Sequence, residues 1–109
     1  MSYRKIAEVG EIPSDGMRKF TIEDKDILII NIDGAFYAIN NKCTHMGGDL
    51  SKGKLEGKIV QCPRHGSKFD VTTGEAVRGP KILFVNFNTK NIRTYETKLD
   101  GNNLMIKIS

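Results

Sequence analysis

Four soft metal ligands are gathered in one stretch of this chain and constrain its fold more than any other feature. Cys43 and His45 form a C-x-H pair, and after sixteen intervening residues Cys62 and His65 form a C-x-x-H pair. The chain has two cysteines and two histidines, so this stretch holds all of them. The short spacing puts each pair on one loop, and the residues between suffice for an outward and a returning path. The fold must therefore bring two short loops together.

The pattern leaves several kinds of chemistry to compare. A Cys43–Cys62 disulfide would leave both histidines unexplained and suits a reducing compartment poorly. A Cys–His hydrolase pair would use one residue of each type, not two. Zinc held by two thiolates and two imidazoles is one metal interpretation, although zinc ligands more often follow C-x₂₋₄-C and H-x₃₋₅-H spacing. The other is a [2Fe–2S] cluster in which two histidines replace two cysteines on one iron. Spacing alone leaves both metal interpretations open.

Short apolar runs separated by turn residues predict an all-β fold. The Asp33-Gly34 and Asp100-Gly101 turns each join two such runs in the manner of a β-hairpin. No long stripe of period 3.6 is present, so we expect little helix. The pattern predicts an antiparallel β-sandwich or barrel-like base. The expected strands lie at residues 5–9, 17–22, 26–32, 35–39, 58–61, 82–87, 92–99 and 103–108, with two shorter runs on either side of Thr73-Gly74.

Length and glycine content indicate how the chain is organised. A chain of 109 residues is enough for one compact domain, 1–109, with a modest core. Seven glycines lie between residues 40 and 80, which predicts a subdomain of tight loops, about 41–81, built on the β base. The longest aliphatic run, Ile27–Ile30, is far too short to cross a membrane, and the N-terminus has no apolar signal region. We therefore expect a cytoplasmic protein without a membrane partner.

The positive charge of the chain is concentrated in the same stretch. The net charge is +4, and residues 41–81 hold eight basic and four acidic residues, while the rest of the chain holds nine of each. A surplus of this kind is either a solvated lysine-rich surface or a face that steers an acidic partner. Aromatic residues are not interleaved with the basic ones, so nucleic-acid binding is not expected.

The segment CTHMGGDLSKGKLEGKIVQCPRHGSKFDVTTGEAVRGP resembles the cluster-binding segment of Rieske proteins. The resemblance lies in the C-x-H and C-x-x-H pairs, the GG after the first pair, the HG after the second, and the FD, TG and closing GP. It implies one [2Fe–2S] cluster per chain, with Cys43 and Cys62 on one iron and His45 and His65 on the other. Pro80, in the closing GP, resembles the family's covering loop, although it could also be a plain turn residue. Met46 either shields the cluster or is an ordinary apolar loop anchor, which is the interpretation that we favour.

Departures from the pattern point to one branch of that family. Respiratory Rieske proteins carry an extra cysteine in each loop, and these form a disulfide; the corresponding positions here are Gly48 and Arg64. Ring-hydroxylating oxygenases add a catalytic domain whose mononuclear iron needs two histidines and a carboxylate, and this chain has no histidine to spare. The resemblance therefore implies the soluble ferredoxin branch: an electron carrier, not an enzyme.

The ligand set and its neighbours bear on the redox potential. Two ferric ions, two sulfides, two thiolates and two neutral imidazoles sum to zero charge, so an electron is added more easily than to a four-cysteine cluster. Ser67 occupies the position where respiratory Rieske proteins have a serine that bonds a bridging sulfide. Phe69 stands where they have a tyrosine that bonds a cysteine sulfur. We expect one potential-raising hydrogen bond to be kept and one lost.

The expected function is one-electron transfer from a reductase to an oxygenase or another redox enzyme, with an acidic docking face on the partner. Two alternatives belong to other classes. One is a zinc-stabilised interaction module. The other is an accessory subunit resembling the small subunit of nitrite reductases, which shares the fold and often lacks the four ligands that are intact here.

Overall fold

The central element of the fold is an antiparallel sheet that is covered on both faces. The computed structural model describes residues 3–44, 47–64, 66–78, 81–82, 85–86 and 90–108. The four strands of the central sheet lie in the order β11-β4-β3-β2. Their bounds are β2 (Gly16–Ile22), β3 (Lys25–Ile32), β4 (Ala35–Asn40) and β11 (Thr94–Tyr95).

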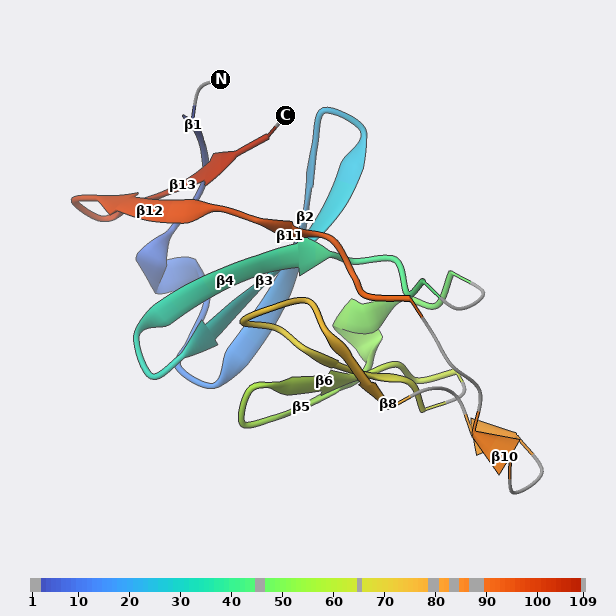
Figure 1. The fold of residues 1–109 in the computed structure, drawn as a ribbon. Helices are drawn as coiled ribbons and strands as arrows, with labels where there is room; N and C mark the ends of the chain where they lie inside the picture. The colour runs from blue at the N-terminus through green and yellow to red at the C-terminus, as the bar shows by residue number, and fades with distance from the viewer. Residues whose placement is uncertain are drawn as a thin grey trace.

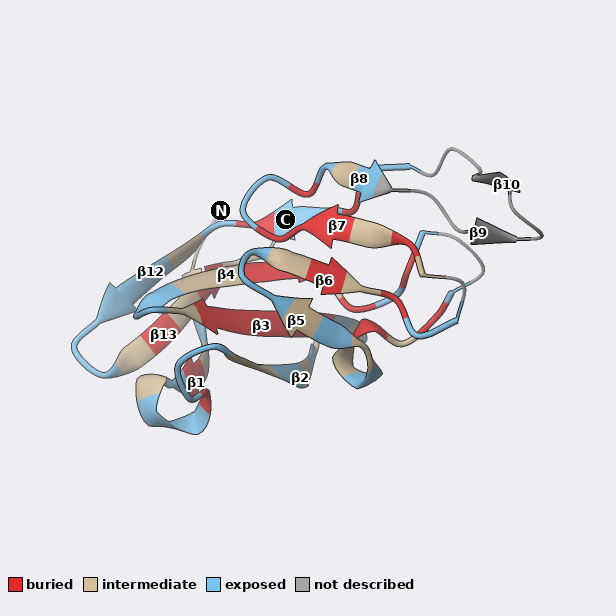
Figure 2. Ribbon diagram, turned by 90° about the horizontal axis from the view of Figure 1, so that it is seen from below, coloured by how far each residue is buried: buried red, intermediate tan, exposed pale blue. Residues whose placement is uncertain are grey.

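Strand β3 shows why this sheet is the middle layer. Ile27, Leu28, Ile29 and Ile30 are all 0% exposed. Successive side chains of a strand point to opposite faces, so a run buried at every position needs cover on both sides. Leu28 and Ile30 pack into one apolar cluster, and Ile27 and Ile29 pack into another. Figure 2 shows this strand buried along most of its length.

The first covering layer is a three-stranded sheet made of the two ends of the chain. Its order is β1-β13-β12, so the N-terminal strand pairs with the C-terminal one. Leu104 and Ile106 alternate on the buried face of β13 and join Ala7 and Ile12 beneath the central sheet. The strand bounds are β1 (Tyr3–Glu8), β12 (Thr97–Asp100) and β13 (Asn103–Lys107).

The second covering layer is a smaller sheet of four strands in the order β5-β6-β7-β8. Val60 and Phe69 are cross-strand partners that point inward and are 0% exposed. They pack on the apolar cluster that contains Leu28 and Ile30. This cluster lies on the face of the central sheet opposite the three-stranded sheet (Figure 1). The bounds are β5 (Lys54–Glu56), β6 (Ile59–Gln61), β7 (Lys68–Asp70) and β8 (Ala76–Arg78).

The all-β expectation is confirmed, and the differences are local. Strand β5 was not predicted from the sequence. The run at 92–99 is divided between β11 and β12, which belong to different sheets. At the run predicted for 82–87, the described residues form two short strands that pair with each other, β9 (Lys81–Ile82) and β10 (Val85–Asn86). Among the described residues the helical elements are two short 3₁₀ turns, η1 (Val9–Glu11) and η2 (Leu50–Lys52). No helix in the described part of the chain is long and apolar enough to span a membrane.

Candidate metal centre

The two cysteine loops close in the same way despite their different sequence spacing. The backbone N–H of Cys43 donates to the carbonyl of Gly48 at 2.8 Å, and the N–H of Gly47 donates back to Cys43 at 3.1 Å. In the second loop the N–H of Cys62 donates to Ser67 at 2.7 Å, and the N–H of Gly66 donates to Cys62 at 3.2 Å. In both loops the partners are therefore the fourth and fifth residues after the cysteine.

A glycine with a positive φ stands at the matched position of each loop. Gly47 has φ 68° and Gly66 has φ 79°, in the left-handed region that other L residues rarely adopt. Each lies four residues after its cysteine, where the chain must reverse to complete the closing hydrogen bonds. The matched turns give Cys43 and Cys62 equivalent places at the base of two similar loops.

The two cysteines lie in the apolar cluster between the central sheet and the small four-stranded sheet. Cys43 is 3% exposed and Cys62 is 2% exposed, and neither is in a disulfide. Both pack with Leu50, Val60 and Phe69. The loops thus present their thiols from the interior side, where water has little access.

Gly48 shows how closely the two loops approach. A Cβ atom added there would lie 2.6 Å from Sγ of Cys62, closer than a real Cβ contact allows. It would also lie 3.5 Å from Cγ of Arg64. The positions that carry the disulfide in respiratory Rieske proteins are therefore neighbours here, and their residues leave room beside the Cys62 sulfur.

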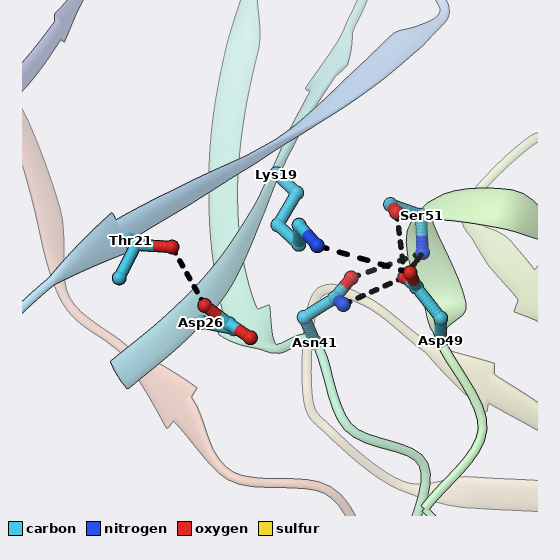
Figure 3. Close-up of polar contacts among 6 residues, drawn as sticks. All are labelled: Lys19, Thr21, Asp26, Asn41, Asp49 and Ser51. Atoms are coloured by element: carbon cyan, nitrogen blue, oxygen red, sulfur yellow. Dashed lines mark hydrogen bonds and ion pairs between the residues drawn. The ribbon is translucent and has the colours of Figure 1, made fainter. Parts of the chain in front are cut away.

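A polar network holds the neck of the first loop (Figure 3). Oδ1 of Asp49 accepts from the Asn41 side-chain amide at 2.7 Å, and from the hydroxyl and backbone N–H of Ser51 at 2.6 and 3.0 Å. The Asn41 oxygen accepts from the same Ser51 N–H at 2.9 Å, and Lys19 Nζ of β2 lies 3.8 Å from Asp49 Oδ2. The network ties the loop to the end of β4 and to the central sheet.

The same contacts lower the pKa of Asp49. Hydrogen bonds from Ser51 and Asn41 favour the charged carboxylate, and Lys19 adds a smaller attraction. Burial opposes these effects without cancelling them. Asp49 is thus held as an anion that organises the neck. The sequence analysis did not predict this network; the available signal was Asp-Leu-Ser, an acidic cap two residues before a serine at the start of a short 3₁₀ turn.

A second carboxylate organises the turn that follows β7. Asp70 is buried, accepts from the hydroxyl and N–H of Thr72 at 2.6 and 2.9 Å, and pairs with Lys58 Nζ at 3.3 Å. Burial raises the pKa of Asp70, but the hydrogen bonds from Thr72 and the interaction with Lys58 outweigh it, so the net pKa is lowered. Asp70 therefore links the turn after β7 to the turn before β6.

Ser67 has an unusual environment for a hydroxyl. The residue is 1% exposed, and its Oγ has no hydrogen-bond partner among the residues that the structure describes. A buried hydroxyl without a partner costs free energy, and such groups are rare in native structures. Ser67 lies on the second cysteine loop, and its backbone carbonyl accepts the closing hydrogen bond from the N–H of Cys62.

The structure describes part of the predicted ligand set. Cys43, Cys62 and Ser67 are placed as above, whereas His45, His65, Met46 and Pro80 lie outside the described residues. Within the described residues no group of three or more Cys, His, Asp or Glu side chains could hold a metal ion. The ligation by two cysteines and two histidines therefore stays a prediction.

Comparison with known proteins gives a consistent result along most of the chain. The Rieske [2Fe-2S] domain family matches residues 2–95. The ferredoxin component of the naphthalene 1,2-dioxygenase system of Pseudomonas aeruginosa is 38% identical over 99 residues, which cover 91% of this chain and 88% of that protein. The biphenyl 2,3-dioxygenase ferredoxin component of Rhodococcus jostii (strain RHA1) is 32% identical, and the match covers 99% of this chain and 94% of that protein.

A solved structure agrees with the sequence matches. The ferredoxin of Sphingomonas yanoikuyae B1 superposes with a TM-score of 0.83 at 25% sequence identity, and the match covers 99% of this chain and 100% of that one. The arrangement of sheets described above is thus shared over the full length of both chains.

Proposed function

Because this chain belongs to the Rieske [2Fe-2S] domain family, we propose that it is a one-electron carrier that passes electrons from a reductase to an oxygenase or another redox enzyme. The relatives matched over nearly the whole chain are named as ferredoxin components of dioxygenase systems. The observation that carries the proposal is the pair of matched loops, each of which presents one buried, unbridged cysteine. An electron carrier needs a centre that partners can approach, and it needs no substrate pocket.

The residues present fit a [2Fe–2S] cluster. The thiols of Cys43 and Cys62 come from equivalent places on two loops, and Gly48 leaves space against the Cys62 sulfur that a side chain would fill. The Ser67 hydroxyl is a buried donor without a protein acceptor among the described residues, as expected of a group directed at a sulfide. We propose that Cys43 and Cys62 bind one iron and that His45 and His65 bind the other.

When bound, a cluster of this type supplies a site that takes up and releases one electron at a time. The protein contributes the surroundings. Leu50, Val60 and Phe69 keep water from the cysteine side, and the Asp49 network holds the neck of the first loop. The Ser67 hydroxyl stabilises added negative charge, whereas Phe69 at the position of the respiratory tyrosine offers no hydroxyl. This combination favours a midpoint potential between those of low-potential ferredoxins and respiratory Rieske proteins.

The remaining expectations belong to the same proposal. They are a single domain spanning 1–109, a cluster-binding subdomain of about 41–81, and a cytoplasmic location shared with the partner redox enzymes. Cell fractionation that follows the red-brown chromophore tests the location.

Electron paramagnetic resonance of the dithionite-reduced protein tests the function, with iron, acid-labile sulfide and zinc measured on the same sample. We expect two irons and two sulfides per chain and a rhombic signal of a histidine-ligated [2Fe–2S] cluster. A colourless protein that contains zinc and no acid-labile sulfide would refute the proposal.

A further inference from the structure

The outer face of the small sheet carries a groove that the electron-transfer proposal does not use. Strand alternation points Leu55, Val60 and Phe69 inward, so their neighbours point outward. A cavity of about 320 Å³ lies over this face. Its lining combines charged, polar and apolar side chains from all four strands of the sheet: Lys54, Glu56, Ile59, Gln61, Lys68 and Val77.

The groove continues to the second cysteine loop. A second cavity of about 300 Å³ shares Lys54 and Gln61 with the first and extends to Cys62 and Gly66. A protein segment lying in the groove would therefore reach the loop on which we place two ligands of the centre. This position suits a partner that exchanges electrons with it.

Two lysines of this groove carry charges that no described carboxylate neutralises. On the base sheets (the central and the three-stranded sheet) Lys5, Lys19 and Lys107 each pair with a carboxylate, whereas Lys25 and Lys98 form no ion pair with a described residue. Lys54 and Lys68 likewise form no ion pair with any residue that the structure describes, and they differ from the base lysines in standing close together. They stand on the same cross-strand row with Gln61 between them, so two unneutralised ammonium groups flank the middle of the groove.

An apolar patch adjoins this pair of charges. Val77 is 47% exposed and is one of two large hydrophobic side chains exposed among the described residues; the other is Leu99 at 52%, on β12. Val77 and the half-buried Ile59 lie on the side of the groove away from the cysteine loop. Lysines beside a small apolar patch match a protein surface with carboxylates beside an apolar side chain.

We propose that this groove is the docking site for an acidic surface segment of a redox partner. A carboxylate of the partner lies between Lys54 and Lys68, and an apolar side chain covers Ile59 and Val77. A second copy of this chain suits the site poorly, because its net charge is +4 and its surplus lies in the same 41–81 stretch. The inference rests on the proposed function, since it assigns the partner surface for that electron transfer.

The test uses the reduced holoprotein and, as probe, the oxygenase component of the naphthalene 1,2-dioxygenase system, whose ferredoxin component is 38% identical to this chain. Stopped-flow absorption gives the second-order rate of electron transfer at low and high salt. We expect the double variant Lys54→Glu/Lys68→Glu to lose about tenfold in rate at low salt, with most of the difference gone at high salt. Lys25→Glu/Lys98→Glu on the base makes the same change in net charge and should lose less than twofold.

The apolar contact is tested in the same assay. Val77→Ser should lower the rate about two- to threefold at every salt concentration, because the lost contact is not electrostatic. Leu99→Ser removes the other exposed hydrophobic side chain and should leave the rate unchanged.

Three outcomes would overturn the docking site. The first is an equal loss of electron-transfer rate in the two charge variants. The second is a wild-type electron-transfer rate that is absent or independent of salt. The third is self-association of the protein in sedimentation that only the groove variants abolish. The dithionite-reduced spectrum separates these from failure of the electron-transfer proposal. A normal spectrum in every variant leaves the carrier role intact, whereas its absence in the wild type removes both.

Discussion

The base sheets and the small sheet are stabilised by different means. In the base, β2 pairs with β3 through seven residue pairs and β3 with β4 through six. In the small sheet, β5 with β6 and β6 with β7 pair through three each. The base buries an unbroken aliphatic strand, while the small sheet depends on a few inward side chains and on carboxylates that bond turns and loop necks. We infer that the base folds on apolar burial, whereas the geometry of the cysteine loops depends on directed polar bonds.

Loss of one cysteine should give the largest contrast between the two regions. Cys62→Ser removes a proposed ligand, so we expect the visible chromophore to be lost and the iron content to fall close to zero. The apolar cluster between the central and the three-stranded sheet does not include Cys62, so amide exchange should stay slow at Ile29 and Leu104. Retention of full iron and sulfide would show that Cys62 is not a ligand.

Core truncations should separate the regions energetically. Ile29→Ala deletes a fully buried side chain of the base and should cost about 2–5 kcal/mol of unfolding free energy in denaturant titrations. Phe69→Ala should cost about 3–5 kcal/mol. Because Phe69 belongs to the same apolar cluster as both cysteines, this variant should also release iron faster, measured with an external chelator. Equal rates of iron release in the two variants would contradict the distinction.

Asp49 tests whether polar bonds hold the first loop. Asp49→Ala leaves the Asn41 amide and the Ser51 hydroxyl without their acceptor. It should lower the free energy of unfolding by about 1–3 kcal/mol and make iron release faster. Asp49→Asn keeps an oxygen at the same place and should cost less than half as much. Lys19→Met removes only a half-exposed ion pair and should change stability by less than about 1 kcal/mol. Identical losses of unfolding free energy in Asp49→Ala and Asp49→Asn would argue against the network.

Ser67 tests the link between the small sheet and the redox potential. Removal of its hydroxyl by Ser67→Ala should lower the midpoint potential, because a donor to the reduced centre is lost. The expected shift is on the order of 60 mV, which corresponds to about 1.4 kcal/mol for one electron. Thr21→Ala serves as a control and should leave the potential unchanged, since that hydroxyl bonds Asp26 on the central sheet. Protein-film voltammetry gives both values, and an unchanged midpoint in Ser67→Ala would remove Ser67 from the site.

Acid should weaken the small sheet before the base. The pKa values of Asp49 and Asp70 are lowered in the folded protein, so their carboxylates contribute stability above the usual value of 3.8. That contribution is lost as pH falls from about this value through the lowered pKa. Amide exchange at Val60 should therefore accelerate below about pH 4 relative to that at Ile29. Asp70→Asn should reduce this acid sensitivity, and parallel acceleration at both amides in the wild type would contradict it.

Sequence reasoning located most strands because they have local signals, and the ligand spacing supplied the prediction of the site. Alternating apolar residues indicated β13, and the Asp33-Gly34 turn indicated the β3–β4 hairpin. Strand β5 was not predicted, because Lys54–Glu56 contains one apolar residue and therefore shows no alternating pattern. Its extended conformation depends on pairing with β6. The run at 92–99 looked continuous, since nothing local marks the change of partner between Tyr95 and Thr97.

By itself, the sequence determined that the fold is all-β and that every cysteine and histidine falls within residues 43–65, because residue type and spacing are local properties. Only the tertiary structure decided that the two loops close identically, that Asp49 holds the first and that unneutralised lysines flank a groove on the small sheet. These features depend on hydrogen bonds and on cross-strand neighbours. Such contacts join residues far apart in the chain, and their partners are fixed only when the sheets pack.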